Sequence, residues 1–193
     1  MLQHDNPFRR FTQGLSQLKR IKDACLQLQE EAGANPNLVL FAVWTAQQQL
    51  RIHPDWPTNF QQLVNWNRDY TQQLRRQHNE LQRLAPRADK DENGPLHQMQ
   101  QLLQQAEGLA EVQEQAVLYF YYQQRTGLLE CENRTAALLE NLSLCFAEPS
   151  KVEDTNLKIL LEIILDEQEA AALVLRLREQ LEKRFARQAG VAN

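Results

Sequence analysis

The stretch NPNLVLFAVWTAQQQL, residues 35–50, decides the fold of this chain. Asn35 is a natural N-cap, and Pro36 suits the first helical position because the amide hydrogen it lacks would be unpaired there anyway. The run from Leu38 to Trp44 that follows is apolar around almost the whole helix circumference. A helix of that composition is stable only when other elements surround it. We therefore expect a central helix that begins at Pro36 and continues to Leu50.

The rest of the chain shows helix periodicity as well. Apolar residues recur at intervals of three and four, and no run alternates with a period of two. Glycine and proline are scarce and mark the ends of the expected helices. Phe8 and Phe11 are expected in a short turn before the first helix, Thr58 as the N-cap of the third, and residues 87–94 in an exposed loop. Besides the central helix, we expect helices over residues 16–32, 58–86, 95–124, 128–146 and 155–187.

These helices predict an all-α fold, an antiparallel bundle of five or six helices with a long C-terminal helix. Residues 1–149 are expected to form a helical bundle domain. Residues 150–193 are expected to supply a C-terminal helix that packs on the bundle or extends from it. The side chains expected to face the core include Tyr70, Met99, Leu102, Ala106, Leu109, Leu175 and Phe185.

Composition limits the function. The 193 residues suffice for a core without disulfides, and the net charge of −4, with both signs interspersed, argues against nucleic acid as a partner. The most hydrophobic stretch, residues 157–177, is broken by charged residues, and the N-terminus has no signal-peptide pattern, so we expect a cytoplasmic protein without membrane contact. The three cysteines, Cys25, Cys131 and Cys145, are far apart and are expected to act as small buried apolar residues.

No catalytic motif is present in the sequence. It has no P-loop, no dinucleotide-binding glycine pattern, no nucleophile elbow and no zinc-protease motif. The four histidines have neither mutual helical spacing nor an E-x-x-H partner of the kind that di-metal bundles use. The sequence therefore predicts no metal site and no cofactor.

A row of three glutamates is the strongest candidate for a site. Glu107, Glu111 and Glu114 lie at i, i+4 and i+7 of one helix, on a line that Leu103, Leu118 and Tyr121 continue. Carboxylates on an apolar line must be paired, because an unpaired buried charge costs several kcal/mol. Arg68 and Arg75 lie seven residues apart on the preceding helix, and we expect at least one to pair with the row. A structural network, a ligand or partner groove, and a solvated face all remain open for this row.

A second candidate is a pocket lined by aromatic side chains. Trp44, Trp66 and tyrosines such as Tyr119 lie on three of the expected helices. Ligand pockets in helical proteins form between helices and are rich in such residues. These rings are therefore candidates for the lining of an inter-helix pocket.

Several of these residues lie in motifs that resemble a known family. The segment ACLQLQ, residues 24–29, is followed by Gly33, Asn37 and the apolar run to Trp44, and this succession resembles the opening of an uncharacterised bacterial family, domain of unknown function 2390. The resemblance covers roughly residues 15–146. Its later elements are Trp66 with Leu74-Arg75, and then Ala106-Glu107, Ala110-Glu111, Glu114 and Leu118-Tyr119.

The chain departs from the family pattern at two places. Lys19-Arg20-Ile21 stands where the family has a tyrosine and a proline-glycine turn, and Asn35-Pro36 stands where it has aspartate and valine. The resemblance implies no activity, because the function of the family is unassigned. It does place the three glutamates, Arg75 and Trp66 on motif positions.

The sequence favours a non-enzymatic, cytoplasmic interaction or adaptor protein. The absence of catalytic motifs and the long, heptad-like final helix indicate a helix face that binds a protein partner or a second copy of the chain. One alternative is a binder of a small or lipid-like molecule in an inter-helix pocket. The other is an enzyme that uses Glu107, Glu111 or Glu114 as acid, base or metal ligand.

Overall fold

The central helix predicted from residues 35–50 is present in the computed structural model, which describes residues 1–88, 94–146 and 151–191. Helix α3 runs over Pro36–Gln47, and the side chain of Asn35 caps it by accepting hydrogen bonds from the backbone amides of Asn37 and Leu38. Every residue from Asn37 to Ala46 is buried. The helix ends earlier than expected, because Gln49 takes a left-handed backbone conformation and Leu50 begins a strand.

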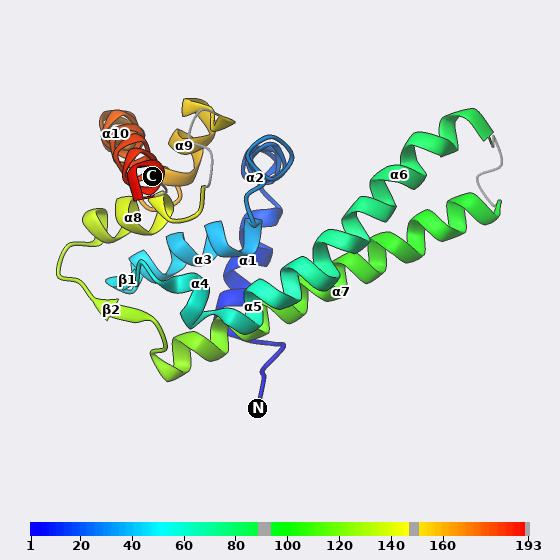
Figure 1. The fold of residues 1–193 in the computed structure, drawn as a ribbon, viewed down its shortest axis with the longest axis horizontal. Coiled ribbons are helices and arrows are strands. Elements are labelled where there is room, and N and C mark those ends of the chain that lie inside the picture. The colour runs from blue at the N-terminus through cyan, green and yellow to red at the C-terminus, as the bar shows by residue number, and fades with distance from the viewer. Residues whose placement is uncertain (89–93, 147–150, 192–193) are drawn as a thin grey trace.

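Four helices surround α3 in the body of the molecule (Figure 1). They are α1 (Pro7–Ser16), α2 (Lys19–Ala32), α8 (Arg134–Ser143) and the second half of α7 (Pro95–Gln124). Outside them, α9 (Asp154–Leu161) packs on α2, and α10 (Glu167–Val191) packs on α8 and α9. The all-helical class predicted from the sequence is confirmed. Among the residues that the structure describes, no helix combines the length and apolar composition needed to cross a bilayer.

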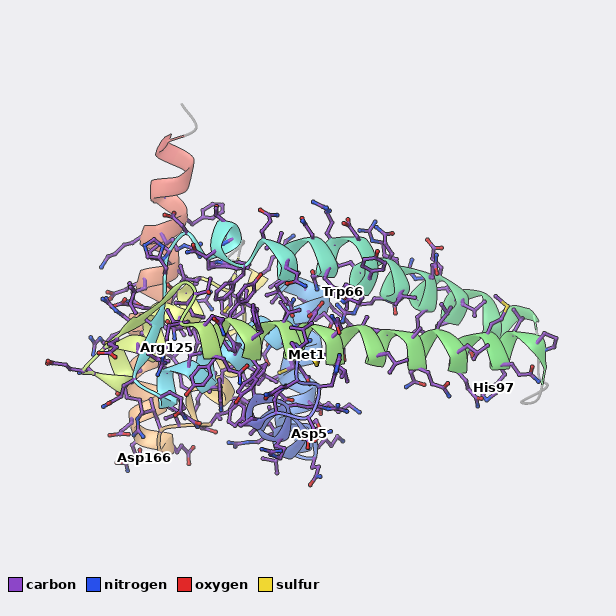
Figure 2. The ribbon with its side chains drawn as sticks, turned by 90° about the horizontal axis from the view of Figure 1, so that it is seen from below. Met1, Asp5, Trp66, His97, Arg125 and Asp166 are labelled. Carbon is purple, nitrogen blue, oxygen red and sulfur yellow. The ribbon has the colours of Figure 1, made fainter. Side chains whose placement is uncertain are left out.

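Two helices project from this body as an arm (Figures 1 and 2). Helix α6 (Gln72–Ala88) runs antiparallel to the first half of α7, and residues 89–93, which join them, lie outside the described residues. The second half of α7 lies in the body of the molecule, where it contacts α1, α3 and α5 (Gln61–Trp66). A single continuous helix therefore supports both the arm and the core.

The structure contains a short β-ribbon that the sequence analysis did not predict. Strand β1 (Leu50–Ile52) pairs antiparallel with β2 (Leu128–Glu130). The buried side chain of Asn141 holds β1 in place by donating to the Leu50 carbonyl and accepting from the Ile52 amide at 2.7 Å. Strands of three residues are too short to show alternation, so periodicity could not reveal them.

Several predicted helices are divided or shifted. Phe8 and Phe11 lie on α1, so the expected turn is a ten-residue helix. Thr58 is not a cap but lies inside α4 (Trp56–Asn59), which begins two residues earlier than expected. The helix predicted from Leu128 begins instead at Arg134, after the Asn133 cap. The predicted final helix is divided into α9 and α10, and α6 continues to Ala88, through the first part of the expected loop.

Candidate functional site

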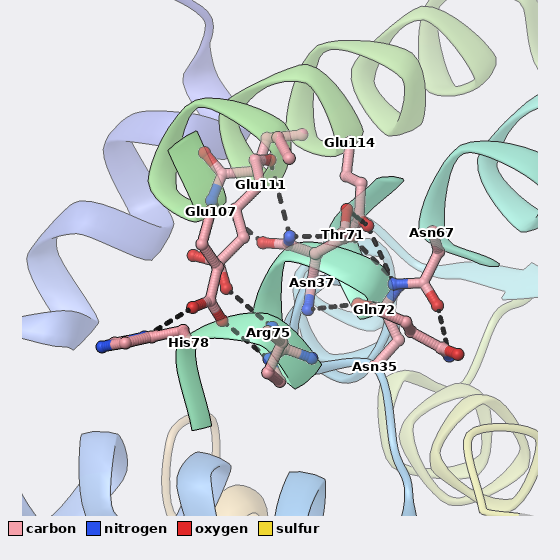
Figure 3. A network of polar contacts seen from close by, with 12 residues as sticks. Asn35, Asn37, Asn67, Thr71, Gln72, Arg75, His78, Glu107, Glu111 and Glu114 are labelled. Carbon is pink, nitrogen blue, oxygen red and sulfur yellow. Dashed lines mark hydrogen bonds and ion pairs between the residues drawn. The ribbon is translucent and has the colours of Figure 1, made fainter. Parts of the chain in front are cut away.

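The glutamate row of α7 faces α6 and the start of α3 (Figure 3). Arg75 of α6 bridges two of its members: Nε donates to Oε1 of Glu107 at 2.7 Å, and Nη2 donates to Oε1 of Glu111 at 3.0 Å. The ring Nδ1 of His78 lies 3.3 Å from the second oxygen of Glu107. The side chains of Arg75 and Glu107 are 15% and 16% exposed. The predicted pairing of the row with an arginine is therefore present, and it is mostly buried.

Glu114 is fully buried, and its partners among the described residues are neutral side chains instead of an arginine. Its Oε1 accepts hydrogen bonds from Asn67 at 2.8 Å and Thr71 at 2.6 Å, and its Oε2 accepts from Asn37 at 2.9 Å and Asn35 at 3.1 Å. A buried carboxylate is tolerated when its oxygens are fully hydrogen-bonded. The four neutral donors come from the start of α3 and from the turn before α6, so Glu114 joins three segments of the chain.

Of the two arginines that were candidates for pairing with the glutamate row, Arg75 pairs with it and Arg68 does not. Its guanidinium is exposed and pairs with the neighbouring Asp69 through Nε at 2.7 Å. The reason is the π-helical turn η1 over Asn67–Thr71, which inserts one extra residue into the helix. That residue rotates the segment before it by about 100° relative to α6. Asn67, eight residues before Arg75, takes the place on the α7 side that Arg68 would occupy in a regular helix.

Burial raises the pKa of Glu111 to about 6, although the guanidinium of Arg75 opposes the shift. The nearby carboxylates of Glu107 and Glu114 add to the increase by repelling a third negative charge. Glu111 also lines a small cavity of about 310 Å³, together with Cys25 and apolar side chains. Burial raises the pKa of the Cys25 thiol to about 11, so that thiol is a poor nucleophile at neutral pH.

A wider polar cleft of about 750 Å³ lies beside the network, between the end of α2 and the face of α6. Arg75, Asn67 and Asn35 line it, and all three also hold glutamates of the row. The glutamates themselves are not among its lining residues. The network residues thus stand between the carboxylates and the cleft, an arrangement that favours a structural role for the row.

The three candidate pocket aromatics do not gather around one cavity. Trp44 is buried in the core, with its ring centroid 5.4 Å from that of Phe8 and 6.3 Å from that of Tyr119. Trp66 lies instead at the root of the arm (Figure 2), where its Nε1 donates to the Ala110 carbonyl at 3.1 Å and its ring stacks on Tyr70. Tyr70 is exposed, although the sequence pattern directs it toward the core.

Part of the predicted core face of α7 is exposed to solvent. Met99, Leu102 and Leu109 are 52%, 64% and 71% exposed, and with Ala106 they follow a spacing of three, four and three residues. We call these four residues the α7 stripe. Three residues of the stripe, Met99, Leu102 and Ala106, line an apolar groove of about 530 Å³. Leu81 of α6 and Leu103 of α7 complete its apolar lining.

The final helix does not present the bare apolar face that the sequence suggested. Leu173, Leu177 and Leu181 of α10 are buried, and α10 packs on α8 and α9. Leu175 and Phe185, which the pattern placed toward the core, are exposed. The exposed apolar stripe therefore belongs to the arm and not to the C-terminus.

Within the described residues, no group of three histidine, cysteine or acidic side chains is arranged to hold a metal ion.

The fold and the site define a helical protein with a projecting hairpin anchored by a buried polar network. The profile of the family described as "Protein of unknown function (DUF2390)" matches residues 10–118, more than half of the chain. The chain belongs to this family. The matched region contains the glutamate row, Arg75 and the arm, whereas β2 and α8 to α10 lie beyond it. No curated protein and no solved structure matches the chain.

Proposed function

We propose that this protein is a non-enzymatic, cytoplasmic interaction protein whose docking surface is the α7 stripe. The observation that carries the proposal is the exposure of Met99, Leu102 and Leu109 along one line of a projecting helix. Contiguous apolar surface of this kind commonly marks a protein interaction site. Fully burying one such side chain contributes about 1.5–3 kcal/mol of favourable transfer free energy. A partner that covers the stripe is therefore stabilised in the complex.

The occupant that fits the stripe best is an amphipathic helix of a partner protein. The spacing of three, four and three residues is the pattern of apolar residues that packs against a second helix in a coiled coil. From Met99 to Leu109 the stripe is about 15 Å long, which corresponds to about three helical turns. The apolar groove beside it, walled by Leu81 and Leu103, offers a seat for large apolar residues of such a helix.

The polar residues around the stripe suggest how a partner is selected. Glutamines occupy positions 98, 100, 101, 104 and 105 of α7, and no lysine or arginine occurs anywhere in that helix. Glutamine carries no charge and both donates and accepts hydrogen bonds. Apolar complementarity is therefore the expected main basis of recognition, although the carboxylate of Glu80 also lines the groove.

Comparative affinity purification of the full chain tests the proposal. The variant L102E/L109E places two charges on the stripe, and L175E places one on an exposed apolar residue of α10 as the matched control. All three residues are exposed, so these substitutions leave the fold intact. We expect the wild type and L175E to retain the same partner in stoichiometric amount, and L102E/L109E to lose it.

Two outcomes would contradict the proposal. One is a partner that L102E/L109E retains as well as the wild type does. The other is a stripe that is covered by a second copy of the chain, which light scattering of the purified protein would show as a dimer that L102E/L109E dissociates.

A further inference from the structure

A further cavity, remote from the glutamate row and the arm, lies between the β-ribbon, α8 and α10. Its volume is about 620 Å³, within the range of small-molecule sites. Its apolar wall includes Ile52, Pro54 and Leu129, the last of which is 42% exposed. No sequence pattern indicated this site, because its residues come from four separate segments of the chain, in β1 and the turn after it, β2, α8 and α10.

Cationic side chains dominate the polar part of this cavity. Arg51, Lys183 and Arg184 line it, and Glu140 supplies the one carboxylate among the described lining residues. The chain as a whole carries a net charge of −4, so this excess of positive charge is local. Low-dielectric walls around such charges strengthen the attraction of an anion.

Two buried polar atoms on the lining residues have no hydrogen-bond partner among the described residues. They are Nε of Arg51 and Oε1 of Gln180. The ion pair with Glu140 uses Nη1 of Arg51, at 2.9 Å, and leaves Nε free. A buried donor without an acceptor is costly, so an acceptor that reaches Nε stabilises the folded protein as it binds.

The other cations of the cavity are only partly engaged. The side chain of Lys183 is 71% exposed, and among the described residues its ammonium group pairs with Glu179, at 3.5 Å, one turn away on α10. Exposed pairs of this kind contribute little, so the ammonium group is available to a ligand. Arg184 donates to the Ser143 carbonyl, which fixes its guanidinium beside α8.

We propose that this cavity binds a small organic anion with a phosphate or carboxylate group and a compact apolar part. The oxygens of the anion accept hydrogen bonds from Lys183 and from the guanidinium of Arg51, whose buried Nε turns toward the ligand as it binds. A hydroxyl or protonated oxygen of the ligand donates to Oε1 of Gln180. The apolar part lies against Ile52 and Leu129. This inference is independent of the docking role proposed for the α7 stripe.

Titration calorimetry of the full chain with three probes tests the site. Phenyl phosphate has both the anionic group and the apolar ring, inorganic phosphate has only the first, and benzyl alcohol has only the second. We expect saturable 1:1 binding of phenyl phosphate, weaker binding of inorganic phosphate and none of benzyl alcohol. Absence of saturable phenyl phosphate binding at millimolar concentration would overturn the proposal.

Three variants locate the binding. R51K keeps the positive charge but removes Nε–H, and K183Q removes an exposed charge; we expect each to weaken phenyl phosphate binding at least fivefold. The matched control is R176Q, which replaces an exposed arginine on the same helix, α10. This variant should bind phenyl phosphate like the wild type. Equal affinity in R51K, K183Q and R176Q would place the anion elsewhere and refute the assignment. If circular dichroism shows that R51K is unfolded, K183Q decides the question.

Discussion

Glu114 and Glu111 are one turn apart on α7, yet different partners stabilise them. Glu114 is fully buried and accepts four hydrogen bonds from neutral side chains, whereas Glu111 is partly exposed and shares Arg75 with Glu107. The spacing of the glutamates predicted that the row would be drawn into an inter-helix groove. It could not identify the donors to Glu114, because Asn35 and Asn37 are distant in sequence.

The substitution E114Q should destabilise the protein by about 2–4 kcal/mol. The new amide nitrogen would face donors such as Asn67 or Asn37, so two donors would oppose each other in a buried site. Urea denaturation at pH 7 measures the change. E182Q, on the exposed face of α10, is the control and should leave the unfolding midpoint unchanged. Equal midpoints for E114Q and E182Q would show that Glu114 is not a structural anchor.

Glu111 should titrate with a midpoint of about 6, above its ordinary pKa of 4.5, because burial disfavours the charged form. A pKa raised by folding means that the group stabilises the native state below pH 4.5 and that this stability is lost as the pH rises through 6. The side chain is 38% exposed, so solvent screening limits the loss to about 1 kcal/mol. Carbon-detected NMR of the carboxyl group measures the midpoint, and a value at or below 4.5 would contradict the burial argument.

At the scale of the elements, helix register decides which residues meet. Helix α7 has the bounds predicted from the sequence, since Pro95 begins it and no other proline interrupts it. The helix predicted before it was wrong in register, because a π-helical turn leaves no clear mark in apolar periodicity. Arg68 was therefore predicted on the wrong face, and Asn67 and Thr71 were missed. The β-ribbon was not predicted because each of its strands has only three residues, too few to show an alternating pattern.

The two arginines of the predicted pair should differ sharply in their effect on stability. R75A should destabilise the protein by about 3 kcal/mol, because it leaves Glu107 and Glu111 without their buried cation. It should also move the NMR midpoint of Glu111 further upward, because Arg75 lowers the pKa of that carboxyl. R68A should change neither the denaturation midpoint nor the titration of Glu111. Similar effects of R68A and R75A would mean that the π-helical turn is absent in solution.

At the scale of the whole molecule, the sequence predicted the helical class but not the projecting arm. Apolar periodicity marks which face of a helix avoids water, but it does not say whether the covering surface belongs to the same chain. Leu118 and Leu102 lie on the same helix and look equivalent in the sequence. Only Leu118 is covered by the body, whereas Leu102 remains on the open face of the arm.

Alanine substitutions should separate the two halves of α7. L118A removes a fully buried side chain and should lower the free energy of unfolding by about 2–5 kcal/mol. L102A, in the exposed stripe, should change it by less than about 0.5 kcal/mol. Thermal and urea denaturation of the isolated protein give both values. A loss of stability in L102A comparable to that in L118A would mean that the stripe is covered within the molecule itself.

Photo-crosslinking in the native cell tests the docking role of the arm most directly. A photoreactive amino acid placed at position 102 or 109 reports what lies within a few ångströms of the α7 stripe, and the same probe at position 175 reports on exposed α10. We predict one crosslinked product of defined mass from positions 102 and 109, containing a different protein, and no such product from position 175. No product at either stripe position, the same product from position 175, or a product with the mass of two copies of this chain would contradict the account.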